Sequence, residues 1–329
     1  MPATTLEAVH RPRKNPMKSI ITITGDIGSG KSTIARALEA RLGYKAITTG
    51  AIQREIAARR GLTSLQLNEL SAKDAAVDNT IDSYLKQLND TAAELVLDSR
   101  LAWHFVAGAY NVYVSVDPRV GAERVLAHKR SQEVHVDVND AMRNNLQRRH
   151  LENTRFEDLY GVHGDDPRNF DLTVDSTWTD AECIASLLIQ AYRGRTTSHP
   201  DGRAQICPKS LYPTKDICDL DSPGSEDILA SMRKNGYDPS APVEAVRFSN
   251  YYFIHDGHKR TSCALRLGIS HIPVILHLAS EESAAKGLLY REEISAALTR
   301  PWIHDWEAAL KFRFPSYPDP TGYPRFDQP

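Results

Sequence analysis

Glycines spaced around a lysine form the clearest chemical pattern in this sequence, within the segment ITGDIGSGKST at residues 23–33. The pattern G-x-x-x-x-G-K-[ST] is typical of a loop whose backbone N–H groups enclose phosphates, while its lysine and hydroxyl serve the terminal phosphates and Mg²⁺. A strand-like run precedes the loop and an amphipathic helix pattern follows it, as the motif requires. We therefore predict that ATP and Mg²⁺ are bound by Gly25, Gly28, Ser29, Gly30, Lys31, Ser32 and Thr33.

Arginines follow predicted strands at positions where they could contact a phosphate acceptor. Arg54 lies on the predicted helix after the second strand, and Arg100 follows the segment LVLDS. Asp98, at the end of that strand, is placed to act beside Mg²⁺ together with Ser32. Further arginines of interest are Arg124, Arg130, Arg148, Arg149 and Arg155. Because a guanidinium is planar, permanently charged and able to bind phosphate in bidentate fashion, the set favours phosphoryl transfer to a bound acceptor.

The acceptor side lacks an obvious general base. The nearest carboxylates are Asp26, inside the glycine-rich loop, and Asp98. Transfer to a phosphate oxygen needs no base, whereas transfer to an alcohol benefits from one. The sequence also lacks the N-K-x-D motif of GTPases, which disfavours that class.

A second pattern that suits an anion lies in FIHDGHKRTSCALRLG, residues 253–268. Asp256 and Gly257 form a predicted turn, where the glycine permits close approach of backbone to a ligand. The following helix begins with three groups able to carry positive charge: His258, Lys259 and Arg260. A helix N-terminus adds to this charge, so a phosphate site competes with the alternative of a tight turn and a solvated basic cap. Weaker candidate acids in the preceding segment are Glu226 and Asp227.

The elements that must position these residues alternate between strand and helix patterns over residues 18–193. Strands are predicted at residues 19–25, 45–49, 93–99, 110–117 and 170–177, and helices at 31–43 and 51–61. This alternation predicts an α/β fold with a parallel sheet flanked by helices. In the first helix, Ile34, Leu38 and Leu42 recur at the spacing of one helical face.

Outside residues 18–193 the sequence predicts four further parts. Residues 1–17 form a basic flexible arm, and the polar residues 194–204 form a linker. A smaller α+β domain is predicted at residues 205–280, followed by a helical and then aromatic- and proline-rich extension at 281–329. A length of 329 residues agrees with two domains.

Composition narrows the class of protein. The net charge is −2 with 25% charged residues, so no global basic bias favours nucleic acid as a partner. The apolar runs are too short to span a bilayer, and the first residues lack the apolar segment of a secretory signal. The four cysteines are scattered without CxxC pairs, which indicates reduced thiols in a cytoplasmic protein. Composition leaves the oligomeric state open.

Residues 18–192 resemble cytidylate kinases, especially the short archaeal type. The resemblance is carried by the segment from ITITGDIGSGKST to REIAARRG, by LVLDSRLAWHF at residues 95–105, and by residues 147–178, which are similar to the lid of the family. It implies that Thr49, Gly50, Arg54 and Arg100 hold the acceptor. It also implies that the catalytic residues are Lys31, Asp98, Arg100, Arg148 and Arg155, the last two on the lid.

The sequence departs from that family at positions that face the acceptor. Ala51 and Gln53 replace an acidic residue and an aromatic, and Ser99 replaces the glycine of the Asp-Gly-Arg segment. The resemblance therefore supports kinase chemistry more strongly than it supports CMP as the acceptor.

Residues 205–279 resemble the ParB/sulfiredoxin-like superfamily, which includes free serine kinases. The match rests on ICPKSLYPTKDI, on DILASMRKNGYDPSAPVEAV and on the HDGHKR turn. It implies a nucleotide phosphate site at Asp256, Gly257, His258, Lys259 and Arg260, with Glu226 nearby. The turn lacks the cysteine that sulfiredoxin chemistry needs.

Three readings follow. The first is an ATP-dependent kinase of a small molecule or nucleotide in a biosynthetic pathway, bifunctional if the second phosphate site is also catalytic. The second keeps the kinase but makes a modified pyrimidine in DNA its acceptor. In the third, the C-terminal domain is a non-catalytic nucleotide sensor.

Overall fold

The computed structural model describes residues 18–48, 58, 61, 76–90, 93–127, 137–195, 202–217, 224–321 and 324. Some predictions concern residues outside these ranges. They are the basic arm at 1–17, most of the helix at 51–61, Arg130, and the acceptor residues Thr49, Gly50 and Arg54.

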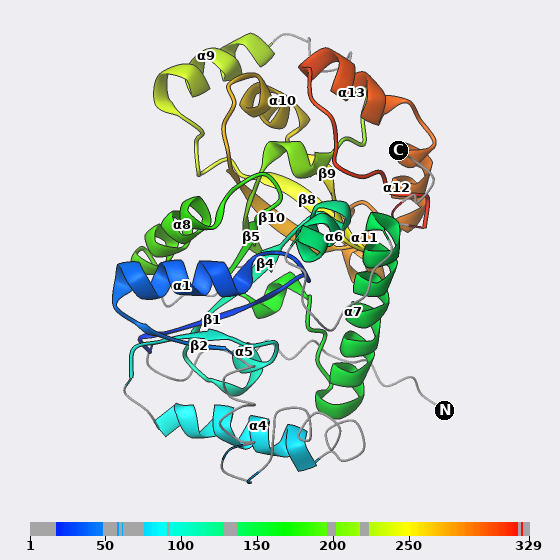
Figure 1. Ribbon diagram of the computed structural model, residues 1–329. Helices are drawn as coiled ribbons and strands as arrows, with labels where there is room; N and C mark the ends of the chain where they lie inside the picture. Colours follow the sequence, from blue (N-terminus) through cyan, green and yellow to red (C-terminus); the bar gives the residue numbers. More distant parts are fainter. Residues whose placement is uncertain are drawn as a thin grey trace.

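Strands from both halves of the chain join in one ten-stranded sheet with the order β2-β3-β1-β4-β5-β6-β10-β8-β9-β7 (Figure 1). Their bounds are β1 Ile20–Gly25, β2 Lys45–Thr48, β3 Leu95–Asp98, β4 Tyr110–Ser115, β5 Leu172–Asp175, β6 Arg203–Ile206, β7 Leu211–Tyr212, β8 Val243–Phe248, β9 Tyr251–Asp256 and β10 Ile272–Leu278. Strands β1 to β5 pair in parallel, which confirms the α/β prediction for the N-terminal half. Their carboxyl ends meet at one edge, where α/β proteins bind ligands.

Helices cover both faces of the sheet. Their bounds are α1 Lys31–Leu42, α4 Ala76–Gln87, α5 Ala102–Phe105, α6 Pro118–Ala127, α7 Val138–Tyr160, α8 Ala181–Arg193, α9 Ser225–Asn235, α10 His258–Arg266, α11 Glu281–Ala285, α12 Arg291–Leu298 and α13 Trp302–Leu310. In the N-terminal half, α1 and α8 share one core with the sheet, whereas α4 and α5 share another. The predicted flanking by helices is thus confirmed.

The first helix begins and ends at glycines, as its sequence predicts. Gly30 at the N-cap and Gly43 at the C-cap both adopt left-handed backbone conformations, and the Gly43 N–H donates to Glu39 O. Left-handed φ is costly for residues with a Cβ, so glycine is favoured at such caps. Ile34 and Leu38, one turn apart, are buried against the sheet. The helix N-terminus is thereby held at the carboxyl end of β1.

The longest helix in the described part of the chain, α7, carries the predicted lid arginines. Asp137 caps it by accepting from Asp140 N at 2.8 Å, and the helix ends at Gly161 with φ 64°. Figure 1 shows α7 along one flank of the molecule, reaching the C-terminal half at one end. It packs on α6, so two helices border the phosphate loop on this side.

The C-terminal half is an α+β unit with its own cores. On one face of its strands, Met232, Cys263 and Trp306 of three helices pack together. On the other, the aromatic extension lies against the sheet, where the rings of Phe314 and Tyr212 stack with centroids 4.3 Å apart. The C-terminal extension therefore packs on the C-terminal half through its aromatic side chains.

The two halves share the sheet through β6. This strand pairs in parallel with β5 and antiparallel with β10. Arg203 and Ala204, which the sequence assigned to a linker, are therefore the first residues of a strand. Just before them, a Cβ at Gly202 would lie 2.2 Å from Leu276 O, so only glycine fits this close approach. Within the described ranges, no helix combines the length and apolar character needed to cross a bilayer.

Candidate functional site

The phosphate loop lies between β1 and α1, in the conformation that its glycines permit. Gly25, Gly28 and Gly30 have φ of 141°, 82° and 84°. A Cβ at Gly25 would lie 2.0 Å from Val114 O, which excludes any larger residue. Lys31 extends back across the loop, and its Nζ donates to Gly25 O at 3.1 Å and to Asp26 O at 2.7 Å. The loop thus has left-handed glycines and a lysine folded back over it, and phosphate binding there stays a prediction.

Two oxygen ligands meet at the start of α1. Ser32 Oγ donates to Asp98 Oδ2 at 2.6 Å, and Asp98, at the carboxyl end of β3, is 9% exposed. The parallel register that aligns Ile23 with Asp98 brings the acid beside the loop. A hydroxyl and a carboxylate suit Mg²⁺, which takes one or two protein oxygens and fills its shell with phosphate and water. The pair predicted from sequence as metal ligands therefore fits the ion.

Two of the predicted arginines converge on one carboxylate. Arg100 and Arg148 both form ion pairs with Glu152 of α7, the latter at 3.1 Å. Burial, and next the charge of Arg148, lower the pKa of Arg100 to about 10, so it remains charged at neutral pH. Arg100 and Glu152 line a pocket together with Gly25 of the phosphate loop. Arg100, which follows β3, and Arg148 of α7 thus bring two cations to one carboxylate near the loop.

Arg155, also predicted to be catalytic, is exposed on the same helix, and neither it nor Arg148 is among the residues that line this pocket. Its role stays a prediction. Arg124 of α6 lies on the other side of the loop, where it donates to Ser176 O at 2.7 Å.

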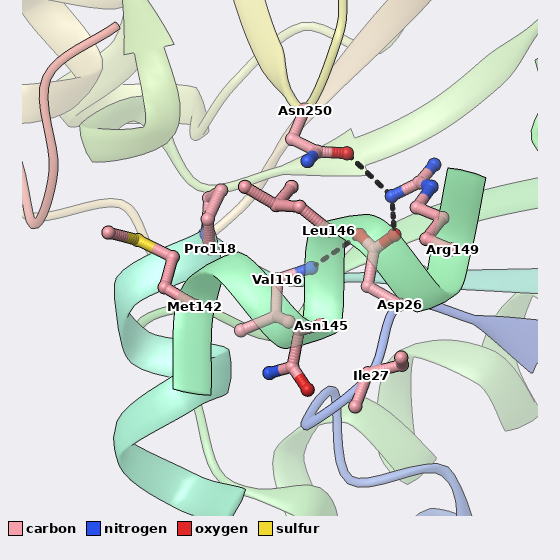
Figure 2. A pocket seen from close by; sticks show the side chains of 9 residues that line it. All are labelled: Asp26, Ile27, Val116, Pro118, Met142, Asn145, Leu146, Arg149 and Asn250. Carbon is pink, nitrogen blue, oxygen red and sulfur yellow. Dashed lines mark hydrogen bonds and ion pairs between the residues drawn. The ribbon is translucent and has the colours of Figure 1, made fainter. Parts of the chain in front are cut away.

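Asp26 is enclosed at the base of the loop (Figure 2). Tyr113 Oη donates to its Oδ1 at 2.7 Å, Val116 N donates to its Oδ2 at 3.1 Å, and Arg149 of α7 forms an ion pair with it. Asp26 is 8% exposed, and its two carboxylate oxygens already accept hydrogen bonds from these donors. This arrangement gives Asp26 a structural role and speaks against the general base considered from sequence.

A cluster of charges extends from Asp26 into the C-terminal half. Arg149 also donates to Asp165 Oδ2 at 2.9 Å, and Arg247 of β8 lies 4.0 Å from Asp26 and 3.9 Å from Asp165. Burial alone would raise the pKa of Asp165, but Arg247 and Arg149 outweigh it and hold that pKa at about 2. We call Asp26, Arg149, Asp165 and Arg247, with Tyr113, the charge cluster.

Sequence reasoning assigned no role to most of this cluster. Arg149 follows Arg148 in the sequence, and no functional motif gives a role to Asp165, Arg247 or the neighbouring Asn250. One local signal pointed to Asn250: a Ser-Asn pair between two strand-like runs is typical of a tight turn. Ser249 indeed has a positive φ of 56° there.

The second predicted phosphate site lies at the start of α10. Gly257 has φ 102° and caps the helix, and Arg260 binds Asp256 at 2.8 Å. His258 is buried, and its Nε2 accepts from Thr214 N at 3.2 Å. Burial, and then the charge of Lys215, lower the pKa of His258 to about 3.

This burial corrects one part of the sequence reading. His258 is neutral at physiological pH, so the cationic groups at the helix start are Lys259 and Arg260. Lys259 and Arg260 are partly exposed, whereas Glu226 is exposed in the first turn of α9, which packs against α10.

The N-terminal half of the chain is similar in sequence to a protein family and to proteins of known activity. A family model described as an AAA domain matches residues 21–146. The cytidylate kinase of Haloarcula marismortui is 30% identical over 190 residues, which cover 57% of this chain and 96% of that protein. An S-adenosylmethionine-dependent nucleotide dehydratase of Lacinutrix mariniflava is 31% identical over 178 residues, which cover 54% of this chain. The matched part spans only 36% of that dehydratase.

Solved structures are less similar. Shikimate kinase from Acinetobacter baumannii, in complex with shikimate, has a TM-score of 0.37 and 16% identity, over 55% of this chain and 94% of that chain. Sulfiredoxin from Arabidopsis thaliana has a TM-score of 0.21 and 14% identity, over 26% of this chain and 93% of that chain. These likenesses are too weak to bear on the chemistry of either half.

Proposed function

The chain belongs to the cytidylate kinase family of ATP-dependent P-loop kinases, and from this premise we propose that it transfers the γ-phosphoryl group of ATP to a small molecule or nucleotide that carries an anionic group. The observation that carries the proposal is the convergence of Arg100 and Arg148 on Glu152 beside the phosphate loop. Two arginines that share one carboxylate can bind an anionic acceptor in bidentate fashion.

The ATP end of the site uses the loop between β1 and α1. Its backbone N–H groups and the α1 N-terminus would bind the phosphates, and Lys31 Nζ would leave its carbonyl partners for the β- and γ-oxygens. Ser29 Oγ is buried without a partner among the described residues, which supports a ligand at the loop. Ser32 and Asp98 would hold Mg²⁺, which when bound neutralises charge on the phosphates.

Phosphoryl transfer then depends on alignment more than on acid–base chemistry. An acceptor oxygen forms a bond to the γ-phosphorus while the bond to the β–γ bridging oxygen breaks and ADP leaves. Arg100 and Arg148 would orient the acceptor and offset the charge on the transferred group. If the acceptor oxygen belongs to a phosphate it is already ionised, which agrees with the engagement of Asp26 elsewhere. Thr49, Gly50 and Arg54 are proposed to complete the acceptor site, and Arg155 to approach the transferred group.

The C-terminal half is proposed to be a ParB/sulfiredoxin-like nucleotide-binding domain, with Asp256, Gly257, His258, Lys259, Arg260 and Glu226 at its phosphate site. The left-handed Gly257 at the start of α10 and the two remaining cations support anion binding there. A catalytic role would make the enzyme bifunctional in a biosynthetic pathway. We place the reaction in the cytoplasm, in keeping with the free thiols of Cys183, Cys207 and Cys263.

The test is phosphoryl transfer by the full chain with ATP, Mg²⁺ and a panel of acceptors, read by phosphorus NMR. CMP, dCMP, serine and hydroxymethylated DNA form the panel. Lys31→Ala should lower turnover by about 100-fold or more, because the lysine contacts the transferred group. Lys45→Ala, at an exposed lysine of β2, is the matched control and should leave turnover unchanged. Transfer to DNA alone would replace the small-molecule acceptor, and transfer unaffected by Lys31→Ala would contradict the site.

A further inference from the structure

The β8–β9 hairpin of the C-terminal half reaches the charge cluster at the base of the phosphate loop. Arg247, in β8, is only 4% exposed. Its three nitrogens donate to separate groups: Nη1 to Asp165 O at 2.7 Å, Nη2 to Tyr113 Oη at 3.3 Å and Nε to Ser249 O at 3.2 Å. Its guanidinium also lies 5.0 Å from the centre of the Tyr113 ring. The contacts join β8 to β4 and to the segment after α7.

The turn of the same hairpin holds the lid helix. Asn250 Oδ1 accepts from Arg149 Nη1 at 2.6 Å, and this nitrogen also contacts Asp26 (Figure 2). Asn250, Arg149 and Asp26 line one pocket with Ile27 of the phosphate loop. The hairpin turn, the lid helix and the loop therefore meet at a single guanidinium.

The charges of the cluster balance only with the C-terminal half in place. Asp26 and Asp165 are opposed by Arg149 and Arg247, one cation for each carboxylate. Removing Arg247 would leave two carboxylates sharing Arg149, in a site where an uncompensated charge is costly. Arg149 would then be drawn from its present place between Asp26 and Asn250.

The geometry points to Arg247 and Asn250 as positioning residues of the kinase site, which orient Arg149 and the Asp26 backbone of the phosphate loop for transfer. This inference rests on the proposed function. Neither residue lines the pocket that Arg100 and Glu152 share with Gly25, so each acts through Arg149, which does line that pocket. The C-terminal half is thus a structural part of the kinase site, whatever its own phosphate site does.

The test compares variants of Asn250 in the full chain, since this turn residue is less buried than Arg247. Asn250→Ala removes the acceptor for Arg149 and should lower kcat about 10- to 100-fold, the loss expected when a group at the reacting centre is displaced. KM for ATP and the thermal unfolding midpoint should stay unchanged. Asn250→Gln keeps a neutral amide acceptor without adding a charge to the cluster, and should restore kcat to within about threefold of wild type.

Two further variants sharpen the result. Arg247→Lys keeps the charge but cannot reproduce three donors to three groups, so kcat should fall as with Asn250→Ala. Asn235→Ala, an exposed asparagine at the end of α9, is the matched control and should behave as wild type.

Each outcome decides between the proposals. Wild type that binds a fluorescent ATP analogue but transfers no phosphoryl group would overturn the proposed function and this inference with it. An active wild type with equal kcat in Asn250→Ala and Asn235→Ala would overturn the inference alone. So would a loss of kcat that Asn250→Gln does not restore, or one that follows a lower unfolding midpoint.

Discussion

The surroundings of His258 give this side chain a different charge from the one that its sequence neighbours suggest. A histidine beside a lysine and an arginine at a helix start suggests a cationic anion site. Here the ring is buried, accepts a hydrogen bond from Thr214 N, and lies edge-on to Trp306 with ring centroids 6.0 Å apart. Its pKa is lowered to about 3 by burial and then by Lys215, so the proton is lost well below neutral pH. The anion site proposed at α10 would therefore depend on the helix N-terminus and on Lys259 and Arg260.

A pH dependence of stability follows from this depressed pKa. The folded protein binds the His258 proton less tightly than the unfolded chain does. The contribution of His258 to the free energy of unfolding is therefore present above about pH 6.5, and it is lost as pH falls toward about 3. The free energy of unfolding should fall with a slope of up to about 1.4 kcal/mol per pH unit from this group. Urea denaturation between pH 7 and 4 should show a shallower slope in His258→Gln. The exposed His163 provides the control, since His163→Gln should keep the wild-type slope.

At the scale of elements, the phosphate loop is shaped by helix α6 as well as by its own glycines. A Cβ at Gly28 would lie 2.2 Å from Gly121 O, and a Cβ at Gly121 would lie 2.7 Å from Ile27 O. Gly30 has a similar φ but open space around its Cβ position. Gly28 and Gly121 therefore let loop and helix pack backbone to backbone, whereas Gly30 serves only the conformation of its own residue.

This difference predicts unequal costs for two alanine substitutions. Gly30→Ala should cost about 1–2 kcal/mol, the strain of a left-handed residue with a Cβ. Gly28→Ala adds a clash with a helix backbone, so it should destabilise more and abolish binding of an ATP analogue. Denaturant unfolding and analogue fluorescence measure the two effects. Equal effects of the two substitutions would show that α6 does not constrain the loop.

On the scale of the whole molecule, the continuous sheet makes the halves interdependent. β6 covers the edge of β5, Cys207 N donates to Asp175 Oδ2 at 3.3 Å, and His271 Nε2 hydrogen-bonds Asp175 O at 2.7 Å. The aromatic extension adds a further tie, since Ser316 Oγ donates to Asp117 Oδ2 at 2.7 Å. Burial raises the pKa of Asp117 to about 6, although the hydrogen bond from Ser316 of the extension acts to lower it.

Truncation should therefore damage the kinase half. A protein of residues 1–195 loses the partner strand of β5 and one cation of the charge cluster. It should unfold at a markedly lower temperature and lose phosphoryl transfer, while the full chain should unfold in one calorimetric transition. A fragment as stable and as active as the full chain would refute this interdependence.

The sequence by itself predicted those features that depend on short-range spacing. Gly25, Gly30, Lys31 and Ser32 lie within one loop and turn, so their geometry follows from the motif. The meeting of Ser32 and Asp98 follows almost as directly, since parallel strands bring their carboxyl ends together. The α/β class and the strands of the first half rest on the same local alternation.

Only the tertiary structure decided what the remaining charged side chains do. Arg148 and Arg149 are neighbours in sequence, but successive residues on a helix point about 100° apart, so one reaches Glu152 and the other Asp26. Arg247 is 221 positions from Asp26, as their numbers give, and nothing in local spacing relates the two. Their pairing depends on β6, which joins the strands of both halves in one sheet, and this long-range pairing sets which charges are buried together.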